Sequence, residues 1–314
     1  MAADRLEQQL EHLRALRALG PTDEVVAALG KALRDRVNVV VAKAASMSAE
    51  FQLRTLMPDL LHALERLFDK PVVNDPQCWG KNAVAKALKD LGHAESAVFL
   101  RGIRHIQREP VWGGEADTAN VLRGTCALAL VQCRDITRDE TFLHLIDAVT
   151  ESDHTVRGDA ALAIEQMAGR EAVWILRMKS RVADRPEVTG QVFESLLRLD
   201  PGSSVSFVAG FLEDKNEEVA EEAALALGAS RLPAALETLT KAWKKSKNSA
   251  IGPVLLRAIS ASRLDEALEF LLKIVREGRQ SESADAVRAL EIHRDSEDIR
   301  RRTEEALARM ARKS

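Results

Sequence analysis

A short sequence pattern recurs at an almost constant spacing, and this repeat constrains the possible fold more than any other feature. Its clearest copies are Val156–Ile164 (VRGDAALAI), Val219–Leu227 (VAEEAALAL) and Leu122–Leu130 (LRGTCALAL). Weaker copies occupy 188–196, 251–259 and 282–290. From Val156 onward the copies lie about 31 to 32 residues apart, which leaves room for two short helices and two tight turns. The chain is therefore predicted to grow by stacking one helical hairpin per repeat.

The composition and the hydrophobic periodicity also favour an all-α fold. Only 16 of the 314 residues are Gly and only 9 are Pro. The residues that form helices best, such as Leu, Ala, Glu and Arg, are abundant. Apolar residues recur at the helical period from end to end, and no convincing strand alternation interrupts them. A chain of this length exceeds the usual size of one globular core, which favours growth by stacking.

The N-terminal repeats are longer than the others. The segment Asn82–Leu88 echoes Val39–Ala45 at a spacing of about 43 residues. Longer loops account for the difference. We therefore expect a single solenoid over 1–314, with elaborated repeats in 1–135 and short repeats in 136–314.

The two ends of the chain are more polar than its interior. Residues 5–17 and 299–312 show helical patterns that are rich in charge. Charged outer faces stop further stacking at the ends of a repeat array. Between these end helices the spacing predicts about eight hairpins.

Three glycines share one column of the aligned repeat. They are Gly124, Gly158 and Gly190. A glycine inside a helix costs about 1 kcal/mol relative to alanine, so three in register indicate a close contact that a Cβ would obstruct. On this basis Gly158→Leu is expected to destabilise the array.

The segment Asp153–Ile164 resembles the HEAT repeat, particularly the short form named after phycobilisome lyases, and Leu212–Gly228 looks the same. The resemblance covers most of the chain. It implies an all-α fold, a right-handed α-α superhelix. In that family an Asp and an Arg flanking a conserved Val form a ladder between repeats, and here Asp153 and Arg157 preserve both.

Some families with a similar repeat fold are enzymes. Their characteristic active-site residues can be looked for in this sequence. Deoxyhypusine hydroxylase holds its irons through paired His-Glu dipeptides, which are absent at all seven histidines. A glycosylase-like enzyme of nucleic-acid repair needs a basic groove, whereas the formal net charge is −3. Nothing in the sequence specifies a bilin lyase-like tetrapyrrole site. We expect no enzyme activity, no cofactor and no metal, with these two enzyme classes kept as the alternative.

The cysteines and the hydropathy bear on the compartment. Cys78, Cys126 and Cys133 are an odd number without paired spacing, which fits a reducing compartment. No stretch approaches the length of about 20 apolar residues needed to span a bilayer. We expect a cytoplasmic protein with neither a membrane nor a nucleic acid as its partner.

Two loops depart from the bare repeat. Asp69–Trp79 and Arg108–Glu115 both place Pro and Trp beside a predicted helix start. The two indoles could fill space at the edge of the stack. Alternatively, the loops converge into a binding patch for a partner. The residues of that hypothetical patch are Trp79, Lys81, Arg104, His105, Trp112, Gly113, Gly114 and Arg123.

The remaining tryptophans, Trp174 and Trp243, lie on apolar helix faces and are expected in the core. Stacked hairpins create extended surfaces that need no cofactor to bind a partner. The sequence therefore favours a non-catalytic scaffold or adaptor. Its expected partner is a protein or a peptide.

Overall fold

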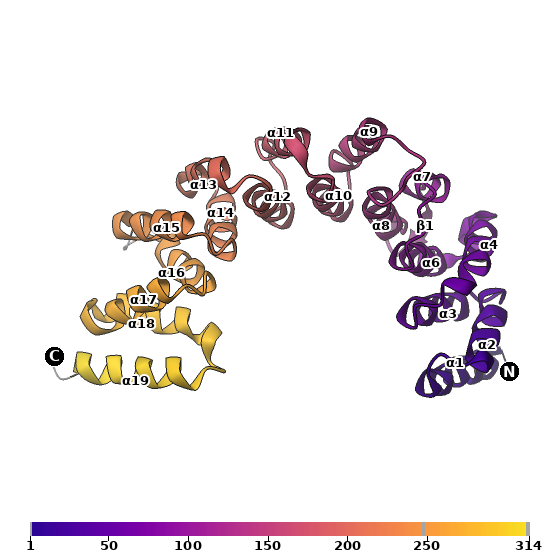
Figure 1. Cartoon of the computed structure of the whole chain (residues 1–314), viewed down its shortest axis with the longest axis horizontal. Coiled ribbons are helices and arrows are strands. Elements are labelled where there is room, and N and C mark those ends of the chain that lie inside the picture. Colours follow the sequence, from indigo (N-terminus) through magenta and orange to yellow (C-terminus); the bar gives the residue numbers. More distant parts are fainter. Residues whose placement is uncertain (1, 247–248, 312–314) are drawn as a thin grey trace. The chain divides into compact units, whose positions relative to one another are not determined.

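The structure is a computed structural model, and it describes residues 2–246 and 249–311 (Figure 1). Helices paired into stacked hairpins make up most of it, which confirms the all-α solenoid expected from the repeat. One expectation is wrong, because a two-stranded sheet interrupts the helices at 108–117. Its strands are only four residues each and contain Pro and Gly, so they carry too little alternation to be recognised in the sequence.

The contacts divide the chain into two compact units, 1–167 and 168–314, and each is described by itself. The interpretation of 1–314 as one solenoid with a change of repeat length at 135/136 stays a prediction. The elements of unit 1 are α1 (Ala2–Leu19), α2 (Asp23–Leu33), α3 (Asn38–Glu50), η1 (Arg54–Leu56), α4 (Met57–Phe68), α5 (Pro71–Asn74), η2 (Pro76–Cys78), α6 (Trp79–Asp90), α7 (Ala97–Ile103), β1 (Arg108–Val111), β2 (Gly114–Asp117), α8 (Asn120–Leu130), α9 (Arg138–Val149) and α10 (His154–Met167).

The elements of unit 2 are α11 (Gly169–Lys179), α12 (Pro186–Leu199), α13 (Pro201–Ala209), η3 (Gly210–Glu213), α14 (Glu217–Ala229), α15 (Pro233–Ser246), α16 (Ile251–Ala261), α17 (Asp265–Glu277), α18 (Gln280–Leu290), η4 (Glu291–His293) and α19 (Glu297–Ala311). The polar end helices predicted from the sequence correspond to α1 and α19. Arg312, the last residue of the second prediction, lies outside the described residues.

The second helix of each hairpin packs directly against the second helix of the next one. In unit 1 these inner helices are α3, α6, α8 and α10, and in unit 2 they are α12, α14, α16 and α18. Each buries the small and aliphatic positions of the repeat, as Ala160, Ala161 and Ile164 do in α10. One small residue per turn lets neighbouring helices approach closely. Apolar burial is therefore spread along each stack instead of being gathered in one centre.

The glycine column is explained at two of its three positions. A Cβ on Gly124 would overlap the carboxylate of Asp159 from the next inner helix, and a Cβ on Gly190 would overlap that of Glu222. Burial raises the pKa of both carboxyls, and nearby acids add to the effect at Glu222. A Cβ on Gly158 would meet no atom of its own unit within 4 Å, and the expectation that Gly158→Leu destabilises the array stays a prediction.

The two tryptophans expected in the core behave differently. Trp243 is buried and packs edge-on against Phe270, with ring centroids 5.5 Å apart. Trp174 is 60% exposed on α11, so the expectation for it is wrong. An apolar face on a short helix does not reveal whether a neighbour covers it.

A close approach between two inner helices of unit 2 yields a stability prediction. A Cβ on Gly228 in α14 would overlap the backbone carbonyl of Ala258 in α16, which cannot rotate aside. Gly228→Ala is expected to lower the free energy of unfolding by about 1–3 kcal/mol, because the two helices must separate. Chemical denaturation followed by circular dichroism measures the change.

The matched control is Gly210→Ala in the same unit. Gly210 has a helical φ of −61°, and a Cβ added to it would meet no atom within 4 Å. Alanine at such a site is expected to stabilise by about 0.4–1 kcal/mol. Equal effects of the two substitutions would contradict the close contact at Gly228.

Candidate functional site

A β-hairpin projects between α7 and α8, in the elaborated part of the chain. Its strands are antiparallel and pair Arg108 with Asp117 at the base and Val111 with Gly114 at the tip. The turn is formed by Trp112 and Gly113. Gly113 has a φ of +93°, a conformation that favours glycine. Figure 1 shows β1 close to the inner helices α6 and α8.

The carboxylate of Glu109 ties the base of the hairpin to the preceding repeat. It is buried and accepts hydrogen bonds from the backbone N–H of Gln77 (2.8 Å), from Gln107 Nε2 (2.6 Å) and from Thr118 Oγ1 (2.6 Å). Burial alone would raise the pKa of Glu109, but these donors outweigh it and hold the pKa below its usual range. Gln107 Nε2 also donates to the backbone carbonyl of Asp75 (2.8 Å).

The carboxylate of Asp75 organises the start of α6. It is fully buried and accepts from the backbone N–H of Gly80 (2.7 Å), the backbone N–H of Lys81 (2.8 Å) and Asn38 Nδ2 (2.8 Å). It also forms an ion pair with Lys81 Nζ at 3.0 Å. The two N–H groups belong to the first turn of α6 and would otherwise lack a partner. Asp75 therefore caps one helix and links it to α3.

The loop between these anchors is strained. Gln77 and Cys78 have φ values of 60° and 56°, in the left-handed region that non-glycine residues seldom occupy. The hydrogen bond from the Gln77 N–H to Glu109 holds this conformation. Cys78 is buried, and burial raises the pKa of its thiol to about 12, against the opposing effect of Lys81. It is therefore protonated at neutral pH and unsuited to nucleophilic chemistry.

Arg123 joins the hairpin to the following repeat. Its guanidinium forms ion pairs with Asp117 (2.6 Å) and Glu151 (3.1 Å), and it donates to the backbone carbonyl of His105 (3.0 Å). Glu151 belongs to the turn before α10, so the buried polar network reaches the next inner helix.

The residues predicted as a binding patch do not share one environment. Lys81 and Arg123 are buried in the network just described and hold the fold together. His105 is half-buried, with its ring edge-on to Phe68 at 5.0 Å, and burial lowers the pKa of its imidazole. The exposed members are Trp79, Arg104, Trp112, Gly113 and Gly114.

Further apolar side chains are exposed in the two loops that carry these tryptophans and just before β1. Val72 and Val73 belong to α5, Ile106 precedes β1, and Val111 stands beside Trp112 at the tip. We call this set the apolar rim, and its members are Val72, Val73, Trp79, Ile106, Val111 and Trp112. Sequence reasoning missed the aliphatic members, although Val72, Val73 and Val111 lie within the two Pro- and Trp-containing loops.

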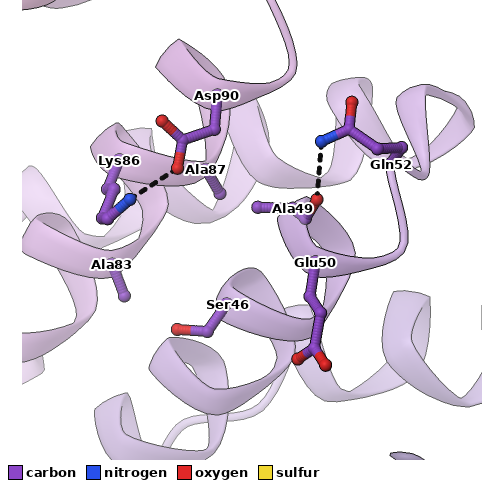
Figure 2. A pocket seen from close by; sticks show the side chains of 8 residues that line it. All are labelled: Ser46, Ala49, Glu50, Gln52, Ala83, Lys86, Ala87 and Asp90. Carbon is purple, nitrogen blue, oxygen red and sulfur yellow. Dashed lines mark hydrogen bonds and ion pairs between the residues drawn. The ribbon is translucent and has the colours of Figure 1, made fainter. Parts of the chain in front are cut away.

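A separate groove of about 370 Å³ lies between α3 and α6 (Figure 2). Alanines form part of its wall, as Figure 2 shows. Lys86 and Asp90 point toward each other across a 2.6 Å ion pair, and Glu50 pairs with Arg17 (2.9 Å). Its charged groups thus have partners within the protein. The lining residues are Ser46, Ala49, Glu50, Gln52, Ala83, Lys86, Ala87 and Asp90.

Comparison with known proteins identifies the repeat. A family model of HEAT repeats matches residues 178–252 and 205–291. This part of the chain contains HEAT repeats. No curated protein matches the chain significantly.

Two solved structures are similar over most of their length. Human deoxyhypusine hydroxylase in complex with glycerol is 18% identical, with 93% of this chain and 91% of that chain covered and a TM-score of 0.30. An engineered protein is 13% identical, with coverages of 97% and 95% and a TM-score of 0.37. With TM-scores this low, the two structures say nothing about the function of this chain.

Two properties of the described residues bear on chemistry and on membranes. No group of three or more His, Cys, Asp or Glu side chains in that part of the chain is arranged to hold a metal ion. Within the same residues, no helix combines the length and the apolar character required to cross a bilayer.

Only Asp153 and Arg157 preserve both residues of the HEAT ladder, so a continuous ladder is not expected, and a buried polar network links the repeats of unit 1. Asp153, the predicted ladder residue, accepts a hydrogen bond from Asn120 Nδ2 of the preceding inner helix at 3.2 Å. The other links use different residues. In three places an acid of the network lies six positions before a base: Asp75 before Lys81, Asp117 before Arg123, and Glu151 before Arg157.

The buried ion pair yields a prediction with an internal control. Lys81→Met leaves the carboxylate of Asp75 buried without its cation, and it is expected to lower the free energy of unfolding of unit 1 by about 3–5 kcal/mol. Lys86→Met removes an exposed ion pair from the same helix and is expected to cost less than about 1 kcal/mol. Urea denaturation measures both. Similar losses would show that the buried pair has no special weight.

The lowered pKa of Glu109 predicts how acid affects the hairpin. A carboxylate whose pKa is lower in the folded state stabilises the fold above its unfolded pKa, and this contribution is lost as the pH falls through the folded value. Glu109→Gln is therefore expected to reduce stability at neutral pH and to flatten the fall in stability below about pH 4, the usual carboxyl range. Denaturation curves from pH 7 to pH 3 measure the difference, and parallel curves would contradict the role of Glu109.

Proposed function

We propose that this protein is a non-catalytic scaffold or adaptor that binds a protein or peptide partner through the apolar rim. The exposure of Trp112 supports this role most directly. Trp112 is fully exposed, at 105% of its reference area, at the tip of a hairpin whose base is held by buried hydrogen bonds and an ion pair.

An exposed tryptophan on a well-anchored element is suited to recognition. Tryptophan is among the residues that contribute most to binding when a partner buries them. The links from Glu109 to Gln77 and from Arg123 to Asp117 restrict the hairpin before any partner arrives. Restricting the binding element in advance reduces the entropy lost on association. Val111, adjacent to Trp112 at the tip, is also exposed and enlarges the apolar area that a partner can cover.

The state of the thiols supports a non-catalytic role. Burial raises the pKa of both Cys78 and Cys126, and that of Cys133 is raised to about 11. None of the three is therefore a thiolate at neutral pH, which disfavours covalent handling of a chromophore. The glycosylase-like and bilin lyase-like alternatives stay predictions, as do membership in the short phycobilisome-lyase type of HEAT repeat and a cytoplasmic location.

The test is affinity capture with the full chain as bait. Trp112→Ala is expected to lose a partner that the native chain captures, because the tip anchor is removed. The identified partner is then purified, and its binding to native and variant chains is measured by calorimetry. Removal of a central anchor is expected to weaken binding by at least about tenfold, since hot-spot side chains contribute about 2 kcal/mol or more.

Trp174→Ala provides the matched control, since Trp174 is also an exposed tryptophan but lies on α11 in the other unit. It is expected to leave binding unchanged. A partner that binds Trp112→Ala as tightly as the native chain would overturn the proposed function.

A further inference from the structure

The hydrogen bonds of the hairpin show which backbone groups point away from it. The N–H of Thr118 donates to the carbonyl of Gln107 at 2.9 Å, which makes these opposite residues a hydrogen-bonded position. Along an antiparallel pair of strands, hydrogen-bonded positions alternate with non-hydrogen-bonded ones, whose backbone groups point outward. In the observed register the bonded positions are therefore Glu109 with Ala116 and Val111 with Gly114.

The remaining residues of the two strands direct their backbone groups outward. On β1 these are Arg108 and Pro110, and on β2 they are Glu115 and Asp117. Proline has no N–H, so the outer edge of β1 is blocked in its middle. The outer edge of β2 carries an N–H and a carbonyl at both Glu115 and Asp117. The hairpin thus has one blocked edge and one open edge.

Nothing else in the described residues uses the open edge. No hydrogen bond there involves the backbone N–H or carbonyl of Glu115 or Asp117. The side chain of Asp117 turns back into the fold, where it accepts from the N–H of Gln107 (3.1 Å) and of Ala119 (3.0 Å) and pairs with Arg123. An unpaired strand edge of this kind is a template for another strand.

The charges along the edge indicate what kind of strand fits. Arg123 neutralises Asp117. The Glu115 side chain is exposed, and within the part of the chain described here it forms no ion pair. A basic residue on an added strand, directly across from Glu115, would supply the missing opposite charge. At the tip, next to Gly114 of β2, Trp112 is fully exposed.

We propose that the outer edge of β2 binds an extended segment of the partner as a third strand, with a Lys or Arg of that segment opposite Glu115 and an apolar residue against Trp112. This inference rests on the proposed function and specifies the partner's binding segment. Backbone hydrogen bonds to Glu115 and Asp117 supply affinity, and the alternating side chains supply selectivity.

The experiment uses the full chain and a fluorescent N-acetylated peptide, Val-Lys-Val-Lys-Val-Lys, with binding followed by fluorescence anisotropy. Two related peptides separate the contributions. One replaces every Lys by Glu, and the other is N-methylated at every residue, so that it keeps its charge but has no backbone donors. The native chain is expected to bind the first peptide, and each of the other two at least about tenfold more weakly.

Two variants at one position isolate the backbone donor of the edge. Glu115→Ala removes the carboxylate and keeps the N–H, and it is expected to weaken peptide binding about threefold, the effect of one exposed ion pair. Glu115→Pro removes both, and it is expected to weaken binding about tenfold further. Because Glu115 is not at a hydrogen-bonded position of the hairpin, the pairing of β1 with β2 is retained.

Several outcomes would overturn the inference. They are equal binding by Glu115→Ala and Glu115→Pro, equal binding of the N-methylated peptide by the native chain, or no binding of the basic peptide. The N-methylated peptide keeps the test valid even if the proline variant folds poorly. With the captured partner, loss on Trp112→Ala but equal binding by the two Glu115 variants would leave the proposed function standing and remove only the strand inference.

Discussion

Unit 1 depends on one buried carboxylate. Asp75 accepts from two backbone N–H groups of α6, from Asn38 of α3 and from the ammonium of Lys81. Its backbone carbonyl accepts from Gln107, at the base of the hairpin. A buried charge is tolerated only when its hydrogen-bonding capacity is filled. The same requirement that stabilises Asp75 therefore fixes the position of α6 against α3 and the place where the hairpin is attached.

This arrangement explains how an irregular element can be added to a regular stack. Each hairpin of helices contacts only its neighbours, so an insertion between α7 and α8 does not disturb distant repeats. The polar network then fastens the insertion on both sides, through Glu109 to the preceding repeat and through Arg123 to the following one. The result is a rigid base and an exposed tip, the combination on which the proposed binding function rests.

The candidate site was only partly predictable. Pro and Trp in two irregular loops drew attention to this region, and Trp79 and Trp112 are exposed there. Lys81 and Arg123, which the sequence suggested as binding residues, are buried and structural. A basic residue near a helix start has the same sequence appearance in both roles. Their structural roles depend on the acids that the folded loops bring to them, Asp75 to Lys81 and Asp117 to Arg123.

The sequence by itself determined the helical hairpin repeat, because the period of apolar residues and the column of small residues follow directly from helix geometry. It also determined that Gly124 and Gly190 lie in close contacts. The tertiary structure alone decided that Trp174 is exposed, that Gly158 is uncrowded within its unit and that residues 108–117 form a sheet. Those outcomes depend on which neighbour covers a face and on hydrogen bonds between residues far apart in the chain, which a local pattern does not encode.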